Sequence, residues 1–166
     1  MKTNIQPKLH SKFEIQNSLL LPNVRVDVLL ESIAYYAVKN MWQELWALAD
    51  KLQREVSVLF DVQGLVWVDI GTIGQVKLAP PIGSQLPLRL WIHTHPRNAY
   101  WSGTDKTTLG FASGILECAL VLGHDHLVKT EFRDFPSICS DDLRIAGWGP
   151  LSNWTAEAAV SYSSLI

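Results

Sequence analysis

Apolar residues recur every three or four positions along one long stretch of the chain. This stretch runs from Asp27 to about Gln53 without a glycine or a proline. The spacing predicts an amphipathic helix that packs on a sheet, with Asp27 at its N-cap and Asn40 as a point at which it can divide. The apolar stripe consists of Leu30, Ile33, Ala37, Met41, Leu45, Leu48 and Leu52.

Alternating apolar and polar residues predict strands in the rest of the chain. A strand is expected at 56–60, and a turn at 63–64 joins it to a second strand at 65–70, which gives a hairpin. Another alternating run at 88–93 predicts a strand that Pro96 ends. The remaining predicted elements are strands at 13–21, 75–79, 118–122 and 127–132 and a helix at 102–116. This order predicts an α/β fold of the α+β type, with a mixed, curved central sheet flanked by helices.

Length and composition place the chain among globular proteins. Its 166 residues suffice for one domain with a real core, and 48% apolar with 18% charged residues is typical of a soluble protein. A net charge of −2 gives no electrostatic reason to expect binding to nucleic acid or to an anionic membrane. No window reaches about 18 apolar residues and the N-terminus is polar, so we expect no transmembrane helix and no signal peptide. A cytoplasmic protein is therefore expected, with Cys118 and Cys139 as free thiols.

The regular pattern ends after residue 132. The segment 133–166 is expected to be a C-terminal extension that packs on the same domain or on a partner. Trp148 and Trp154 are candidates to anchor it. The chain has seven tryptophans, so an aromatic-rich groove for a partner is an alternative to a purely structural use of these side chains.

Two histidines close the predicted strand at 88–93. His93 and His95 are one residue apart, and side chains at i and i+2 of a strand point to the same side. Ser102 and Asp105 then open the next helix. Two imidazoles and one carboxylate leave a fourth position for water, which distinguishes catalytic zinc sites from structural ones. The pattern therefore predicts a metal site, with zinc as the expected ion.

Each fragment by itself has a simpler explanation. A His-x-His pair arises by chance on a surface, and Ser102 with Asp105 is an ordinary helix N-terminus with serine as the cap. A second pair, His124 and His126, lies in a predicted turn rich in glycine and aspartate, which explains it without a metal. Only the first pair is followed by a proline and then by Ser-x-x-Asp, and this combination favours a metal site.

Through His-Thr-His-Pro and Ser-Gly-Thr-Asp the sequence resembles the JAMM metalloproteases, also called MPN+ or JAB proteins. Their motif is an upstream glutamate, then His-(Ser/Thr)-His-Pro, then Ser-x-x-Asp. The resemblance implies that His93, His95 and Asp105 bind one zinc ion per chain and that Ser102 supports the oxyanion of the tetrahedral intermediate. It also implies that Glu55, on the strand after the first long helix, is the general acid/base.

Glu55 is identified through this resemblance, because an isolated glutamate at a strand start is usually just solvated. Glu44 and Glu31 are the other candidates, and both lie within the predicted amphipathic helix. One spacing departs from the family: six residues separate the second histidine from the serine, one fewer than usual, so this loop is tighter. Tyr100 and Trp101 in the loop either hold it in place or line a groove for the substrate.

The resemblance is specific over 88–105 and extends in outline over 25–132. It implies the MPN fold, a cytidine-deaminase-like architecture, for a domain at 1–132 with its core at 25–132. It further implies a prokaryotic deubiquitinase-like enzyme, a zinc-dependent peptidase or isopeptidase that cleaves after the C-terminus of ubiquitin or a ubiquitin-like protein.

Such an enzyme removes the ubiquitin-like protein from a conjugated target or matures its precursor, as in a bacterial anti-phage conjugation operon. Two other functions are considered. One is a metal-free MPN scaffold that only binds partners, and the other is a JAB domain of the type associated with DNA repair.

Overall fold

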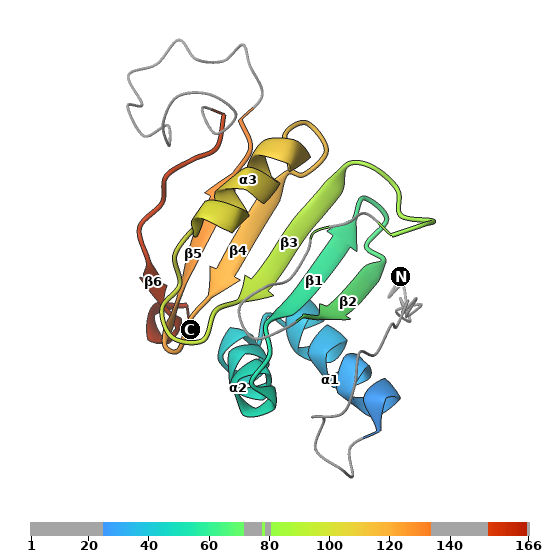
Figure 1. Cartoon of the computed structure of the whole chain (residues 1–166), viewed down its shortest axis with the longest axis vertical. Helices are drawn as coiled ribbons and strands as arrows, with labels where there is room; N and C mark the ends of the chain where they lie inside the picture. Colours follow the sequence, from blue (N-terminus) through green and yellow to red (C-terminus); the bar gives the residue numbers. More distant parts are fainter. Residues whose placement is uncertain (1–24, 72–77, 79–80, 134–152, 166) are drawn as a thin grey trace.

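The computed structural model describes residues 25–71, 78, 81–133 and 153–165 (Figure 1). The helices in these ranges are α1 (Val26–Val38), α2 (Trp42–Leu52) and α3 (Gly103–Ala112). The strands are β1 (Val56–Asp61), β2 (Val66–Ile70), β3 (Leu88–Thr94), β4 (Cys118–Leu122), β5 (His126–Glu131) and β6 (Val160–Ser161), and a 3₁₀ helix (Tyr162–Ser164) follows. The strands form one mixed sheet in the order β2-β1-β3-β4-β5-β6. The predicted mixed α+β architecture with a central sheet is confirmed at this level.

The long apolar stripe forms two helices, because the chain turns at Asn40. Asn40 has a positive φ of 56° and separates α1 from α2. Arg25 is the N-cap of α1, so the prediction of Asp27 at the cap was wrong, and Asp27 lies in the first turn instead. Gln53 ends α2 in the left-handed conformation, with φ 54°, and the chain passes at once into β1. This short connection places Glu55 directly before β1.

The strand that carries the two histidines, β3, lies inside the sheet. It pairs antiparallel with β1, which also pairs with β2 as the predicted hairpin. On its other edge β3 pairs parallel with β4, and the crossover between them contains α3. β5 and β6 continue the sheet in antiparallel pairs. Because β3 has a neighbour on each edge, its histidine-bearing end is held from both sides.

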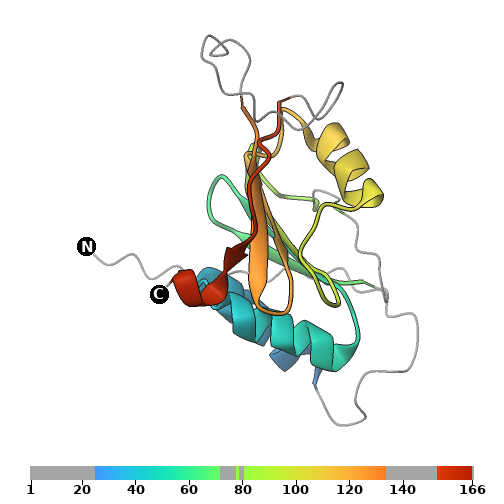
Figure 2. The ribbon, with the colours of Figure 1, turned by 90° about the vertical axis from the view of Figure 1, so that its left-hand side faces the viewer.

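Helices lie on both faces of the sheet and create two cores. The edge-on view in Figure 2 shows α1 and α2 against one face and α3 against the other. The core under α1 and α2 includes the fully buried residues Ile33, Leu45, Val58, Ile92 and Leu122. The core under α3 includes Leu88, Trp91, Leu116 and Trp154. Trp154 fastens its segment to this second core, since its Nε1 donates to the Leu109 carbonyl oxygen at 3.2 Å.

Parts of the sequence-based prediction lie outside the described residues. These parts are the strand at 13–21, the strand at 75–79 apart from Leu78, and also Cys139 and Trp148. Cys118 is a free thiol, and burial raises its pKa to about 11, so it is protonated at neutral pH. None of the helices in the described ranges is long and apolar enough to cross a membrane.

Candidate metal centre

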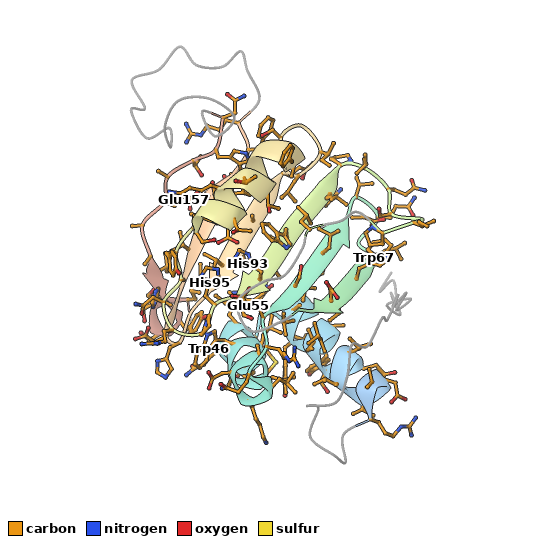
Figure 3. The ribbon with its side chains drawn as sticks, in the orientation of Figure 1. Trp46, Glu55, Trp67, His93, His95 and Glu157 are labelled. Carbon is orange, nitrogen blue, oxygen red and sulfur yellow. The ribbon has the colours of Figure 1, made fainter. Side chains whose placement is uncertain are left out.

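The end of β3 presents two buried histidines towards the start of α3 (Figure 3). His93 stacks on Trp91, with ring centroids 4.4 Å apart, and His95 follows Thr94, the last residue of the strand. The exposed fraction is 0% for His93 and 6% for His95. The backbone N–H of His95 donates to the Leu122 carbonyl oxygen at 2.9 Å, so the second histidine is still tied to β4 after β3 ends.

Asp105, in the first turn of α3, places one carboxylate oxygen beside each of the two histidines. The Nε2 atoms of His93 and His95 lie 3.2 Å apart, and Asp105 places Oδ1 3.1 Å from the first and Oδ2 3.2 Å from the second. A tetrahedral ion with bonds of about 2.0–2.1 Å has ligand atoms about 3.3 Å apart. The three measured separations are close to this value, and one ligand atom from each residue lies within 4.8 Å of the other two. A buried His-His-Asp group at ligand distance is thus able to hold a metal ion.

The protonation states of His93 and Asp105 suit a metal ion. Burial lowers the pKa of His93, so its imidazole is neutral. Burial acts to raise the pKa of Asp105, but hydrogen bonds with His93 and His95 outweigh it and hold this pKa well below its ordinary value. Neutral imidazoles and ionised carboxylates are the forms that bind metals. The two nitrogen donors suit zinc or iron(II) better than calcium or magnesium, which prefer oxygen.

Ser102 and Asp105 also form a complete capping box at the start of α3. The Asp105 N–H donates to Ser102 Oγ at 3.2 Å, and the Ser102 N–H donates to Asp105 Oδ2 at 2.8 Å. The helix-cap and the metal-ligand interpretations of this pair are therefore compatible. Because Ser102 Oγ accepts the capping bond, its own O–H remains able to donate to a molecule in the site.

The loop at 96–101, between the histidines and α3, is fastened by a histidine of the second His-x-His pair. The Ala99 N–H donates to His126 Nε2 at 3.0 Å, so this nitrogen is an acceptor. The other ring nitrogen, Nδ1, therefore carries the proton and faces Asp125 Oδ1 at 2.6 Å. The His126 side chain thus supports the loop at 96–101 by binding the backbone of Ala99, and His126 lies outside the His-His-Asp group.

The turn between β4 and β5 lies unusually close to the same loop. The His124 N–H donates to the Arg97 carbonyl oxygen at 2.7 Å. A Cβ atom at Gly123 would be 2.5 Å from the backbone nitrogen of Ala99 and 2.9 Å from the Arg97 oxygen, so only glycine fits here. With these contacts a loop of six residues brings Asp105 within reach of both histidines.

Tyr100 and Trp101, the two aromatic residues of the loop, have different surroundings. Tyr100 is 57% exposed, and its ring meets the His95 ring edge to face at a centroid distance of 4.8 Å. Trp101 packs against the core under α3, and its ring centroid lies 5.7 Å from that of His93. Trp101 therefore holds the loop in place, whereas Tyr100 is available to a molecule that binds beside His95.

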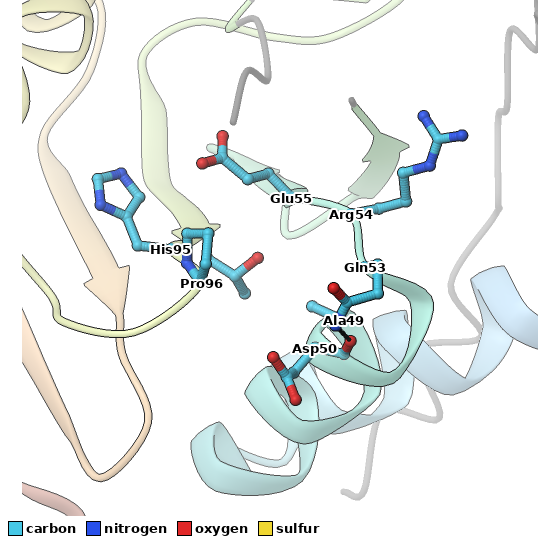
Figure 4. Close-up of a pocket in the computed structure, with 8 residues that line it drawn as sticks. Ala49, Asp50, Gln53, Arg54, Glu55, His95 and Pro96 are labelled. Atoms are coloured by element: carbon cyan, nitrogen blue, oxygen red, sulfur yellow. Dashed lines mark hydrogen bonds between the residues drawn. The ribbon is translucent and has the colours of Figure 1, made fainter. Parts of the chain in front are cut away.

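Glu55 lies directly before β1 with its side chain directed towards His95 (Figure 4). It is 8% exposed, and its carboxylate has no hydrogen bond to any residue that the structure describes. Burial raises the pKa of Glu55, the charge of His95 lowers it, and the charge of Asp105 raises it further. A buried carboxylate of raised pKa beside a metal-ligand group is the arrangement expected of a general base. Glu31 and Glu44, by contrast, are exposed.

A small pocket gives access to Glu55 between the end of α2 and the end of β3 (Figure 4). From α2 and the connection after it, the pocket is lined by Asp50, Gln53 and Arg54. From the end of β3 and the residues just after it, the pocket is lined by Thr94, His95 and Pro96. The pocket therefore connects the carboxylate, one metal-ligand candidate and the solvent.

Two residues that sequence analysis did not single out hold the backbone around the site. Trp46 Nε1 donates to the His95 carbonyl oxygen at 2.7 Å, and Thr94 Oγ1 accepts a hydrogen bond from the Val56 N–H at 3.0 Å. The partners are 49 and 38 positions apart, so no local pattern marks them. His93 Nδ1, in contrast, is buried and has no hydrogen-bond partner among the residues that the structure describes.

Comparisons of this chain with protein-family models, with curated proteins and with solved structures found no match. The functional interpretation therefore rests on the residues and geometry of the site itself.

Proposed function

We propose that this protein is a zinc-dependent peptidase or isopeptidase of the JAMM type, built on the MPN fold. The observation that carries the proposal is the buried carboxylate of Glu55, which has no hydrogen bond to a described residue, beside the group of His93, His95 and Asp105. Within the described part of the chain, no fourth histidine, cysteine or acidic residue joins that group. A structural zinc site has four protein ligands, so a group of three favours a catalytic site with an open position.

In the proposed mechanism the chain supplies a proton shuttle and a hydrogen-bond donor. Zinc, when bound, supplies a water of lowered pKa and polarises the carbonyl of the scissile bond. Glu55 accepts a proton from the attacking water and then delivers it to the nitrogen of the leaving amine. The Ser102 O–H donates to the carbonyl oxygen as negative charge develops there. Asp105 keeps its negative charge throughout, because its pKa lies far below neutral pH.

We propose that the substrate is a ubiquitin-like protein joined through its C-terminus to a target amine or to a precursor extension. This part of the proposal rests on the JAMM resemblance of residues 88–105. Tyr100, exposed beside His95, would contact the substrate residues next to the scissile bond. A cytoplasmic role in removing or maturing such a tag, as in an anti-phage conjugation operon, belongs to the same proposal.

Metal analysis tests the site without any substrate. Elemental analysis of purified wild type is expected to give about one zinc per chain, and His95→Ala is expected to give little. His124→Phe is the matched control, because it removes a histidine of the other His-x-His pair, retains an aromatic ring beside Trp46 and should keep its metal. If all three proteins stay metal-free after zinc is added, the enzyme proposal fails and a metal-free scaffold remains. If iron replaces zinc, an oxygenase-type site becomes the better interpretation.

Cleavage is tested with a panel of ubiquitin-like fusions and isopeptide conjugates. Wild type with zinc should cleave at least one member after the C-terminal residue of the ubiquitin-like part. Glu55→Gln should bind zinc and lose cleavage, since the ligands remain while the proton shuttle is gone. Normal cleavage by Glu55→Gln would contradict the assignment of the base. Salt-sensitive binding to DNA would instead favour the JAB domain of the type associated with DNA repair.

A further inference from the structure

We propose that Thr94, the residue between the two histidines, positions Glu55 for proton transfer by clamping the peptide that follows it. The proposal builds on the role proposed above for Glu55. In it Thr94 touches neither substrate nor metal, and it acts on the reaction only through the backbone of Glu55.

The peptide that joins Glu55 to Val56 is held at both ends. Its N–H, from Val56, donates to Thr94 Oγ1 at 3.0 Å. Its carbonyl oxygen, from Glu55, accepts a hydrogen bond from the Gly71 N–H at 2.8 Å. The first bond joins the peptide to the end of β3, and the second joins it to the residue that follows β2. Both groups of this peptide are thereby satisfied, although the pairing of β1 with β3 has ended and, among the described strands, Val56 pairs only with Ile70 of β2.

The Thr94 hydroxyl accepts a hydrogen bond from β1 at the position just beyond the end of the ladder between β1 and β3. The last backbone pair of this ladder joins Ser57 to His93. The next positions along the two strands are Val56 and Thr94, and here the side-chain hydroxyl takes the place of a backbone acceptor. On its other edge Thr94 still pairs with Leu122 of β4. Thr94 therefore links the strand of the base to a rigid, doubly paired part of the sheet.

Glu55 depends on this link because its carboxylate is not anchored by any residue in the described part of the chain. Its carboxylate makes no hydrogen bond to any described residue, so its backbone is what fixes its place. Thr94 is 2% exposed, so the hydrogen bond from the Val56 N–H to its hydroxyl is buried. A misplacement of about 1 Å in a reacting group costs on the order of a hundredfold in rate. We therefore expect the loss of the hydroxyl to lower the rate of proton transfer by more than its effect on stability alone would.

The test uses three variants of the full-length protein. Thr94→Val replaces the hydroxyl by a methyl group of similar shape, and Thr94→Ser keeps the hydroxyl. Thr130→Val is the matched control. Thr130 lies on β5, is 1% exposed, and its hydroxyl donates to the Thr155 carbonyl oxygen. This variant therefore reports what the loss of one buried threonine hydroxyl does to the protein in general.

The first readout is amide hydrogen exchange and needs neither zinc nor substrate. Exchange at Val56 should be about tenfold faster in Thr94→Val than in wild type, and Thr94→Ser and Thr130→Val should match wild type at this amide. The Gly71 amide should remain protected in all variants, because its acceptor is a backbone oxygen. Unchanged protection at Val56 in Thr94→Val would overturn the clamp whether or not the protein is an enzyme.

The second readout separates positioning from stability. With zinc content equal to wild type, Thr94→Val should lose about tenfold or more in kcat with little change in KM, and Thr94→Ser should restore it. Equal kcat in Thr94→Val and Thr130→Val would overturn the positioning role. A wild type that binds no zinc and cleaves nothing contradicts the proposed function. The exchange rate of the Val56 amide in Thr94→Val then still shows whether the Thr94 hydroxyl holds this peptide.

Discussion

Asp105 accepts a hydrogen bond from the Ser102 N–H through Oδ2, the oxygen that also lies 3.2 Å from His95 Nε2. One carboxylate thus closes the first turn of α3 and contacts the candidate metal ligands. The start of the helix and the candidate metal group are therefore a single unit, and under the proposed function we expect a change at Ser102 to affect both stability and chemistry.

Two substitutions at Ser102 separate these effects. Ser102→Ala should destabilise the protein by about 1 kcal/mol through loss of the cap, whereas Ser102→Gly should cost only a few tenths. Both remove the hydroxyl, so both should lower kcat by about a hundredfold to a thousandfold while zinc is retained. Thermal unfolding, metal analysis and cleavage assays measure the three effects. If kcat follows stability instead, with Ser102→Gly close to wild type, the serine acts as a cap and not as a donor.

Glu55 should make the metal-free protein less stable as the pH rises. Its pKa in the folded state is raised above the ordinary value of 4.5 by burial, so folding favours the protonated form. The stabilising contribution is present below the unfolded pKa and is lost as the pH rises through the folded pKa. Glu55→Gln should therefore melt at a higher temperature than wild type at about pH 8, and the difference should vanish near about pH 4. A constant difference across this range would contradict the raised pKa.

Gly123→Ala should disturb the metal-site loop from outside the site. A methyl group at this position would be 2.5 Å from the Ala99 backbone nitrogen, so the loop must shift. Overpacking of this kind typically costs about 1–3 kcal/mol, and zinc affinity should fall as well. Gly103→Ala is the control, because a Cβ atom there meets nothing within 4 Å and should leave zinc affinity unchanged. Chelator competition together with thermal unfolding measures both effects, and equal zinc affinity in the two variants would contradict this account.

His126 should influence zinc affinity although it is not a ligand. His126→Leu removes the acceptor of the Ala99 N–H and leaves that donor without its partner. Because changes in groups that orient metal ligands cost about tenfold or more in affinity, a similar loss is expected here. His126→Gln offers an amide oxygen in nearly the same place and should retain most of the affinity. Chelator competition on both variants tests this, and an unaffected His126→Leu would show that the loop holds its position without the histidine.

The sequence by itself determined the local elements. The three-to-four spacing of apolar residues predicts the region of α1 and α2, and the alternation of residues predicts β1, β2 and β3, because backbone geometry fixes the repeat of each element. It also indicated that His93 and His95 share one side of a strand and that Ser102 and Asp105 open a helix. It missed Arg25 as the N-cap of α1, because nothing local distinguishes a cap without a side-chain hydrogen bond.

Only the tertiary structure decided which distant groups meet. The pairing of β1 with β3 brings Glu55 beside His95, and the crossover from β3 to β4 returns α3 so that Asp105 reaches both histidines. The bonds made by Thr94 and Trp46 depend on the same pairing and on helix packing. The physical reason is that strand register and helix position are set by the burial of both faces of the sheet, which is a property of the whole chain and not of any one segment.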